Sequence, residues 1–308
     1  MADIGLHQPE RGSWSGMTGC TGEGQAGVAD VGILGVPFDG GISFRSGTAS
    51  APAKLRELSN HLARCADEGQ PLNLQVCDYG DVPVDLDWSR HFRSVEEQAR
   101  AVLRHPFALF LGGDHSVTIP LMKACDSVWD EPFGVVHFDA HPDLFDIYSG
   151  HRWSHACTER RALELRGLDP DRLVLIGIRS VAAKEWAFLR QHPEIPIYTA
   201  RECHRRGMEK IAANVVGLLH DVKSIYLTVD IDGLDPAFAP GTGYAEAGGP
   251  STRDLLELVR RLCDQLPVGA MDVVEVSPPL DHSDITSFAA LKVIYEAWYG
   301  VQQRLHRA

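Results

Sequence analysis

The sequence predicts an α/β fold in which a parallel sheet is covered by helices on both faces. Short apolar runs rich in Val, Ile and Leu recur along the chain, amphipathic stretches of helical length lie between several of them, and polar residues follow four of the runs directly. Continuous apolar runs of this length are typical of strands that are buried on both faces. Their alternation with helices indicates that the strands pair in parallel.

Eight apolar runs are expected to form the sheet. They lie at residues 31–36, 72–77, 107–112, 134–138, 172–178, 195–198, 224–229 and 268–274. Helices are expected at residues 50–64, 94–104 and 251–266, and Ser251 or Thr252 provides an N-cap for the last of them. Because no linker-like composition or internal repeat is visible, we expect one domain over residues 29–308, after a polar, Gly-rich and loosely ordered arm over residues 1–28.

Composition and charge exclude several classes of protein. The formal net charge of −13 argues against nucleic acid or an anionic membrane as a partner and is compatible with a cationic substrate. The seven cysteines are odd in number and include no C-x-x-C pair, so neither a disulfide framework nor a thiolate zinc site is expected. No apolar run approaches the roughly 18 residues of a membrane helix, and no signal-like layout opens the chain. We therefore expect a cytoplasmic protein.

Acidic and histidine residues follow four predicted strands at the point where each strand ends. These residues are Asp114 and His115, then Asp139, His141 and Asp143, then Asp230, Asp232 and Asp235, and finally Glu275 and Asp281. Ligands of such folds lie beyond the carboxyl ends of the strands, and alternate residues of an extended segment point the same way. We therefore expect two imidazoles and four carboxylates to converge: His115, Asp139, His141, Asp143, Asp230 and Asp232.

A mixed histidine and carboxylate set suits divalent first-row metals. The carboxylates are numerous enough to bridge, which favours two metal ions close together. Single clusters of these residues also have structural explanations. His115 could be a buried structural histidine, and Asp230 and Asp232 could form a turn or a helix cap. The three clusters together are much harder to explain in this way, since unpaired buried carboxylates are costly.

Several segments, in this order, resemble the arginase/agmatinase family of ureohydrolases. They are GVPFDGGISFRSG (35–47), GGDHS (112–116), DAHPD (139–143), SHAC (154–157) and TVDIDGLDPAFAPGTG (228–243). The resemblance covers roughly residues 30–300. It implies a three-layer α/β/α fold with a largely parallel eight-stranded sheet and a binuclear manganese centre, with nickel as the alternative ion. It also implies hydrolysis of a guanidino group to urea and an amine by a hydroxide that bridges the two metals, in a homo-oligomer that is a trimer or a hexamer.

The resemblance implies a role for each matching residue. His115 and Asp143 resemble ligands of the first metal, His141 and Asp232 ligands of the second, and Asp139 and Asp230 the carboxylates that bridge them. Asp143 would also pass on a proton, Glu275 would pair with the substrate guanidinium, and His155 would shuttle a proton to the leaving amine. Asp146 and Asp281 have no such role, and surface or supporting hydrogen bonds are expected for both.

The choice of substrate depends on less specific features. Phe145 lies near the place where arginases carry an Asn for the amino-acid end of arginine, which argues against arginase activity. Tyr244 occupies a place where agmatinases commonly have Thr, so its ring either narrows the substrate pocket or turns outward. Agmatine is the favoured substrate. The alternatives are guanidine, guanidinobutyrate or another guanidino acid, formiminoglutamate, and a non-catalytic family subunit, which the complete ligand set disfavours.

Overall fold

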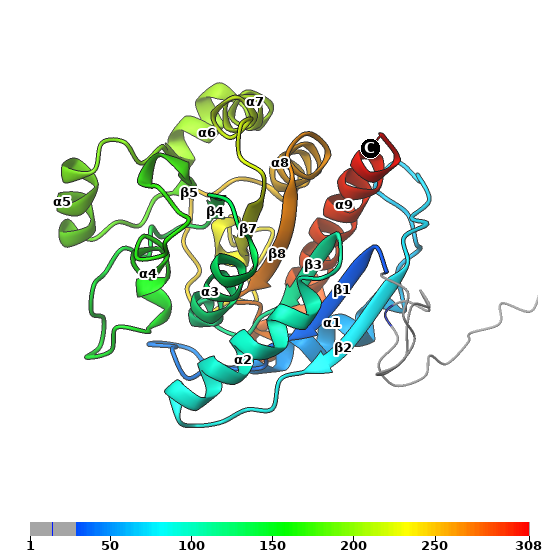
Figure 1. Ribbon diagram of the computed structural model, residues 1–308, viewed down its shortest axis with the longest axis horizontal. Helices are drawn as coiled ribbons and strands as arrows, with labels where there is room; N and C mark the ends of the chain where they lie inside the picture. Colours follow the sequence, from blue (N-terminus) through cyan, green and yellow to red (C-terminus); the bar gives the residue numbers. More distant parts are fainter. Residues whose placement is uncertain (1–13, 15–28, 308) are drawn as a thin grey trace, which may run out of the picture.

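A computed structural model describes Trp14 and residues 29–307, and the expected loosely ordered arm lies almost wholly outside these residues. In the described part, eight strands form one sheet in which every neighbouring pair is parallel. The strand order is β2-β1-β3-β8-β7-β4-β5-β6 (Figure 1). The strands are β1 Val31–Gly35, β2 Val76–Asp81, β3 Phe107–Leu111, β4 Gly134–Phe138, β5 Leu173–Ile178, β6 Ile197–Thr199, β7 Ile225–Asp230 and β8 Val268–Val274.

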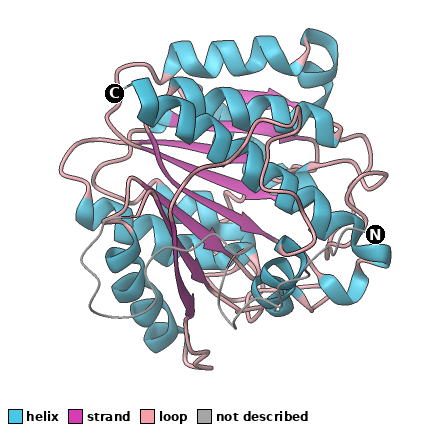
Figure 2. Cartoon of the chain, turned by 90° about the vertical axis from the view of Figure 1, so that its right-hand side faces the viewer, coloured by secondary structure: helices cyan, strands magenta, loops and turns pink. Residues whose placement is uncertain are grey.

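Helices cover both faces of the sheet and complete three layers (Figure 2). One face packs against α1 Ala51–Ser59, α6 Ala200–Arg206, α7 Met208–Leu218, α8 Thr252–Gln265 and α9 Ile285–Arg307. The other face packs against α2 Trp88–Val102, α3 Thr118–Val128, α4 Thr158–Ala162 and α5 Ala183–Gln191. Each face has its own cluster of buried apolar side chains, which confirms the predicted α/β fold with a doubly covered sheet.

Most predicted elements are present, with shifts at three of them. The helix expected at 50–64 ends at Ser59. The strand expected at 72–77 begins only at Val76 and extends to Asp81, because β2 is an edge strand in which only Val76 and Cys77 are buried, so no apolar run marks its second half. The helix expected at 94–104 begins at Trp88, where the side chain of Asp87 accepts a hydrogen bond from the N–H of Arg90. Ser251 caps α8 as expected, in a reciprocal pair with Asp254.

The topology gathers the polar strand ends at one edge. Strands β3, β8, β7 and β4 are consecutive neighbours in the sheet, and all run in the same direction. The polar residues that follow them therefore meet at the carboxyl edge, near the middle of the sheet, which is where such folds place their ligands.

Two further expectations can be compared with the structure. A disulfide framework was not expected; Cys77 forms a disulfide bond, and the other described cysteines, Cys65, Cys125, Cys157, Cys203 and Cys263, are free. Within the residues that the structure describes, no helix combines the length and the apolarity required to cross a bilayer.

Candidate metal centre and active site

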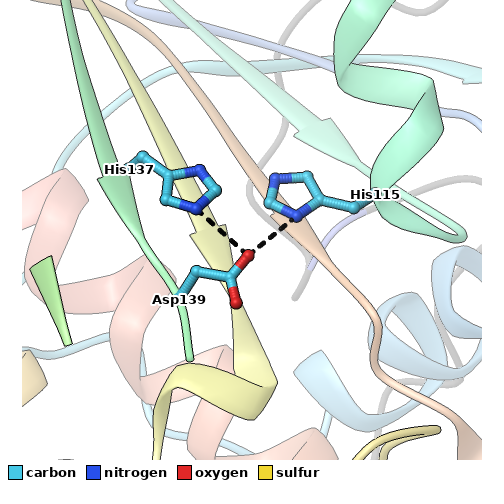
Figure 3. Close-up of side chains that lie close together, drawn as sticks. All are labelled: His115, His137 and Asp139. Atoms are coloured by element: carbon cyan, nitrogen blue, oxygen red, sulfur yellow. Dashed lines mark ion pairs between the residues drawn. The ribbon is translucent and has the colours of Figure 1, made fainter. Parts of the chain in front are cut away.

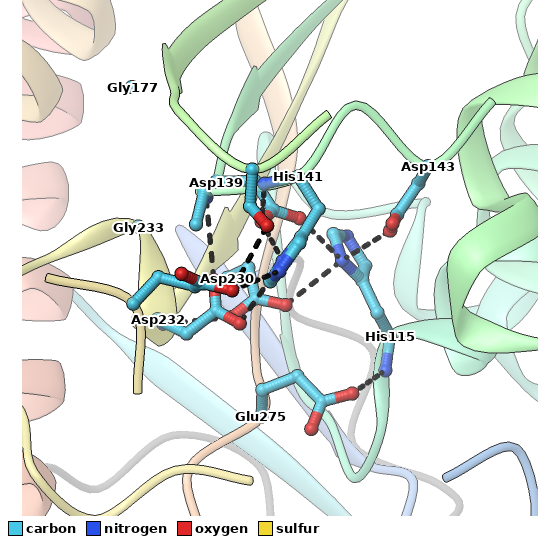
Figure 4. Close-up of polar contacts among 12 residues, drawn as sticks. His115, Asp139, His141, Asp143, Gly177, Asp230, Asp232, Gly233 and Glu275 are labelled. Atoms are coloured by element: carbon cyan, nitrogen blue, oxygen red, sulfur yellow. Dashed lines mark hydrogen bonds and ion pairs between the residues drawn. The ribbon is translucent and has the colours of Figure 1, made fainter. Parts of the chain in front are cut away.

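Three carboxylates converge on one ring nitrogen of His115 (Figure 4). His115 is the first residue of the short helix η2 (His115–Val117), which follows β3 after a short turn. Nδ1 of His115 lies 3.1 Å from one oxygen each of Asp139, Asp143 and Asp230. The other ring nitrogen, Nε2, lies 2.9 Å from Oγ1 of Thr228, which fixes the orientation of the ring. The first donor group thus contains one imidazole nitrogen and three carboxylate oxygens.

A second donor group lies beside the first and shares Asp139 with it. Nδ1 of His141 lies 3.2 Å from Oδ1 of Asp139 and 3.3 Å from Oδ2 of Asp232. Asp139 therefore offers Oδ2 to the first group and Oδ1 to the second. Asp230 reaches the first group through Oδ2, while its Oδ1 accepts a hydrogen bond from the N–H of Asp232. The structure brings together all six residues that the sequence nominated.

His137 also lies at this site, although the sequence analysis did not single it out (Figure 3). Its Nε2 lies 3.2 Å from Oδ2 of Asp139 and 2.8 Å from the carbonyl oxygen of His141, and its Nδ1 lies 3.0 Å from Oε1 of Glu159. Both ring nitrogens are thus engaged, so His137 supports the backbone and carboxylate of the donor groups. Its position inside β4, two residues before Asp139, was the available signal.

The convergence arises from tight turns and not from the extended segment that we expected. The chain bends at residues 139–141, and Asp143 adopts a left-handed backbone with φ of 50°. The carboxylate of Asp139 accepts the N–H of His141 at 2.6 Å, which closes the turn. Gly233 permits the close approach of the two loops, because a Cβ there would lie 2.5 Å from the ring of Phe138.

The clustered carboxylates create a strongly negative site that a bound cation would stabilise. Burial alone would lower the pKa of His115, but the carboxylates of Asp139, Asp143 and Asp230 outweigh it and raise that pKa well above its usual value. Burial, together with Asp232 and Asp139, raises the pKa of Asp230 well above its usual range. Both shifts have the same physical cause, which is that several carboxylates lie close together in a buried site.

Divalent metal ions fit this donor set. Nδ1 of His115 and Oδ2 of Asp139 are buried and form no hydrogen bond with any described residue. Buried polar atoms without hydrogen bonds are costly, and a cation bound by both atoms would offset this cost. Imidazole and carboxylate are donors that first-row divalent metals accept. Asp139, which contributes to both groups, would lie between two such ions.

Glu275 faces the first donor group from the end of β8. Its Oε1 accepts a hydrogen bond of 2.9 Å from the N–H of His115, and its backbone has a φ of 61°, a conformation that is uncommon for non-glycine residues. Burial raises its pKa well above the usual range, and Asp230 and Asp114 add to this shift. A bound cation beside Glu275 would therefore favour its charged form.

A cavity of about 290 Å³ lies next to the donor groups. Its lining is formed by His141, Asp143, Phe145, Tyr148, His155, Ala156, Ser180, Ala182, Glu185, Asp230, Asp232, Tyr244, Glu246 and Glu275. His155, Tyr244 and Glu275, the predicted substrate-binding residues, are all among them. None of the described lining residues is a lysine or an arginine.

Tyr244 faces this cavity, so of the two orientations left open by the sequence the structure has the inward one. Its ring stacks on that of His155 with centroids 6.1 Å apart, and it contacts the ring of His141 edge-on at 5.9 Å. Phe145 also lines the cavity, and the sequence analysis did not identify Tyr148, Glu185 or Glu246 as lining residues. Burial raises the pKa of Glu185 to about 7.

The two acidic residues without an expected role at the site have structural roles. The exposed side chain of Asp146 forms an ion pair of 2.7 Å with the buried guanidinium of Arg161. Asp281 is buried and accepts hydrogen bonds from the N–H groups of Thr286 and Ser287, which lie in the first turn of α9. Neither lines the cavity.

A parallel α/β fold with two histidine and carboxylate groups at its carboxyl edge defines a class of metal-dependent hydrolases. Residues 29–299 match the arginase family, and the chain belongs to this family. Family members are metal-dependent ureohydrolases that use a binuclear divalent metal centre and act on guanidino compounds. The expected family resemblance and fold are thus confirmed.

Curated relatives and solved structures share most of their length with this chain. The chain is 39% identical to a guanidinopropionase and 36% identical to a guanidinobutyrase, both of Pseudomonas aeruginosa, and in each case about 86% of this chain and 85% of the relative are covered. It is 33% identical to an agmatinase of Bacillus subtilis, over 88% of this chain and 92% of the relative. The proclavaminate amidino hydrolase of Streptomyces clavuligerus has a similar structure, with a TM-score of 0.83, 32% identity and coverage of 90% and 93%.

Proposed function

We propose that this ureohydrolase acts on agmatine, releasing urea and a diamine. The observation that carries the proposal is the charge of the cavity lining. Two divalent ions would balance the four carboxylates of Asp139, Asp143, Asp230 and Asp232, and Glu275 would pair with the guanidinium. Glu246 remains as a partly exposed carboxylate beside the rings of Phe145, Tyr148 and Tyr244, whereas both carboxylate oxygens of Glu185 accept backbone N–H groups. Carboxylates and aromatic faces favour a second cation, such as a primary ammonium, on the substrate.

The residues of the site have distinct tasks in this proposal. Two divalent ions held by the six donor residues would supply the nucleophile, because a bound divalent ion lowers the pKa of water. Glu275 holds the guanidinium by charge-assisted hydrogen bonds and turns its carbon toward the attacking oxygen. Asp143 accepts a proton from the attacking water. His155 delivers a proton to the leaving amine, because a protonated imidazole can act as a general acid through a ring N–H group.

A guanidino acid is the second candidate, because one cation lies on the loop that borders the cavity. The guanidinium of Arg45 lies 4.5 Å from the ring centroid of Phe44, and Phe44 contacts Tyr244 with ring centroids 5.3 Å apart. Arg45 could meet a carboxylate at the mouth of the cavity. The names of the guanidinopropionase and guanidinobutyrase relatives also support this candidate.

We extend the proposal to features that the fold and the site leave open. Manganese is the favoured ion, with nickel as the alternative, because both accept histidine and carboxylate donors. Residues 29–308 form one domain, and the protein forms trimers or hexamers in the cytoplasm, as the family resemblance and the free cysteines suggest.

Urea release from a panel of compounds tests the substrate proposal. The manganese-loaded protein is incubated with agmatine, guanidinopropionate, guanidinobutyrate, arginine and guanidine, and kcat/KM is measured for each. We expect agmatine to give the highest value. A higher value for either guanidino acid would transfer the assignment to the second candidate, and no urea from any compound would contradict the proposed function.

A further inference from the structure

Ser43 lies between the two side chains that form one wall of the cavity. Its Oγ lies 3.0 Å from Nε2 of His155 and 2.9 Å from the hydroxyl oxygen of Tyr244. The three side chains come from distant parts of the sequence, since 112 residues separate Ser43 from His155 and 201 residues separate it from Tyr244. Neither motif analysis nor the proposed function assigns Ser43 a task.

The loop that carries Ser43 is held on both sides of it. On one side, the N–H of Gly41 donates to Oδ2 of the buried Asp114 at 2.6 Å. On the other side, the N–H of Gly47 donates to Oδ2 of Asp39 at 3.1 Å. Gly41 has no room for a side chain, because a Cβ there would lie 2.8 Å from both Asp114 and Ser116. The fold thus places the Ser43 hydroxyl against His155 through fixed anchors.

When His155 acts as an acid, only one assignment of donors and acceptors fits the hydrogen bonds of His155, Ser43 and Tyr244. A protonated imidazole carries hydrogen on both ring nitrogens, so Nε2 can only donate. The Oγ of Ser43 must then accept from Nε2, and its own hydrogen is donated to the hydroxyl oxygen of Tyr244. Nδ1 forms no hydrogen bond with a described residue, so Nδ1 is the nitrogen left to meet the leaving amine.

We propose that Ser43 is a positioning residue that keeps a proton on Nε2 of His155 and thereby makes Nδ1 the proton donor of the reaction. This inference rests on the proposed function. When the guanidino C–N bond breaks, its electron pair remains on the departing nitrogen. The Nδ1–H bond then breaks and an N–H bond forms on that nitrogen. His155 is left neutral, with its remaining proton on Nε2 and donated to Ser43.

Kinetics of paired variants test whether Ser43 acts through His155. Ser43→Ala should lower kcat for agmatine about tenfold, the value of one hydrogen bond made in the transition state, with little change in KM. Ser43→Thr, which keeps the hydroxyl, should restore most of the loss. In a His155→Asn background, Ser43→Ala should cause no further loss, because its partner is already absent. Ser46→Ala, a change on the same loop, serves as the matched control and should leave kcat unchanged.

A spectroscopic readout separates failure of this inference from failure of the proposed function. In protein labelled with ¹⁵N-histidine, the His155 signals are assigned by their loss in His155→Asn. The neutral ring should carry its proton on Nε2 in the wild type, and the two tautomers should mix in Ser43→Ala. An equal loss of kcat in both backgrounds, or a ring with its proton on Nδ1 in the wild type, would overturn the inference. The ring measurement needs no turnover, so it decides the role of Ser43 even if the wild type releases no urea.

Discussion

At the scale of single residues, Glu275 contributes negative charge to the cavity and Tyr244 contributes a bulky aromatic wall. Glu275 is buried next to other carboxylates, which raises its pKa. Tyr244 presents an aromatic ring that contacts both His141 and His155. The first side chain is suited to hold the guanidinium, and the second limits the space for the rest of the substrate.

Replacing Glu275 with Gln should impair catalysis while leaving metal content unchanged. The substrate cation would lose a charge-assisted partner in a desolvated site, which costs about 3 kcal/mol. This corresponds to about a hundredfold decrease in kcat/KM for agmatine. The measurement is urea release together with metal analysis of the purified variant. An unchanged kcat/KM would remove Glu275 from the site.

Replacing Tyr244 with Thr should shift preference toward longer guanidino substrates. The ring fills space that Thr leaves open, and pocket walls discriminate substrate size by about 1–3 kcal/mol in relative kcat/KM. Urea release from guanidine, guanidinobutyrate and agmatine by both forms gives the ratios. If the three ratios stay the same, the ring of Tyr244 does not limit the substrate.

At the scale of elements, Arg179 joins the loops that follow β5 and β7 to the loop that carries Tyr244 and Glu246. Its guanidinium donates to five backbone carbonyl oxygens, those of Gly177, Asp232, Gly233, Leu234 and Glu246, at distances of 2.6–3.2 Å. One side chain thus fixes the backbone of Asp232, a candidate metal ligand, and of the cavity wall.

Replacing Arg179 with Met should destabilise the protein by about 3 kcal/mol, because several buried carbonyl groups would lose their donor. The expected decrease in Tm is at least about 5 °C, measured by calorimetry. Arg152→Met is the matched control, since Arg152 forms an ion pair with Glu164 in which both side chains are about half exposed. A Tm for Arg179→Met that equals that of the control would show that the carbonyl contacts contribute little.

The sequence predicted elements best where their residues are buried on both sides. Strands β4 and β7 fall within one residue of their predicted starts, because continuous apolar runs leave little ambiguity. The edge strand β2 was misplaced, because its exposed Asp81 and partly exposed Asp78 and Gly80 interrupt the apolar pattern. Arg179 and Ser43 were not singled out, since their partners are brought near only by the fold.

At the scale of the whole molecule, the sheet order explains why motif residues far apart in sequence act together. The four strands that end in polar clusters are neighbours, so motifs spread over more than 150 residues meet at one edge. The donor set was predictable because each strand carries its own motif. The turns that aim Asp139 and Asp143, and the support from His137, depend on tertiary contacts and were not predictable.

Removing bound metal should destabilise the whole protein. An ion that binds only the native state contributes about 2.7 kcal/mol at a hundredfold excess over its Kd, and the carboxylates would repel one another without it. Calorimetry with and without EDTA should therefore show a decrease in Tm of at least about 5 °C. Restoring manganese in excess should reverse the decrease, whereas an EDTA-insensitive Tm in metal-loaded protein would contradict a stabilising metal.

The number of divalent ions bound per chain tests the central claim most directly. The protein is loaded with manganese, passed through a desalting column and measured by elemental mass spectrometry beside the Asp232→Ala and Asp146→Ala variants. Asp146 has an exposed side chain that does not line the cavity, so its variant is the control. We predict two ions per chain for the wild type and the control, and fewer than two for Asp232→Ala together with loss of urea release. Two ions and full activity in Asp232→Ala would contradict the binuclear centre.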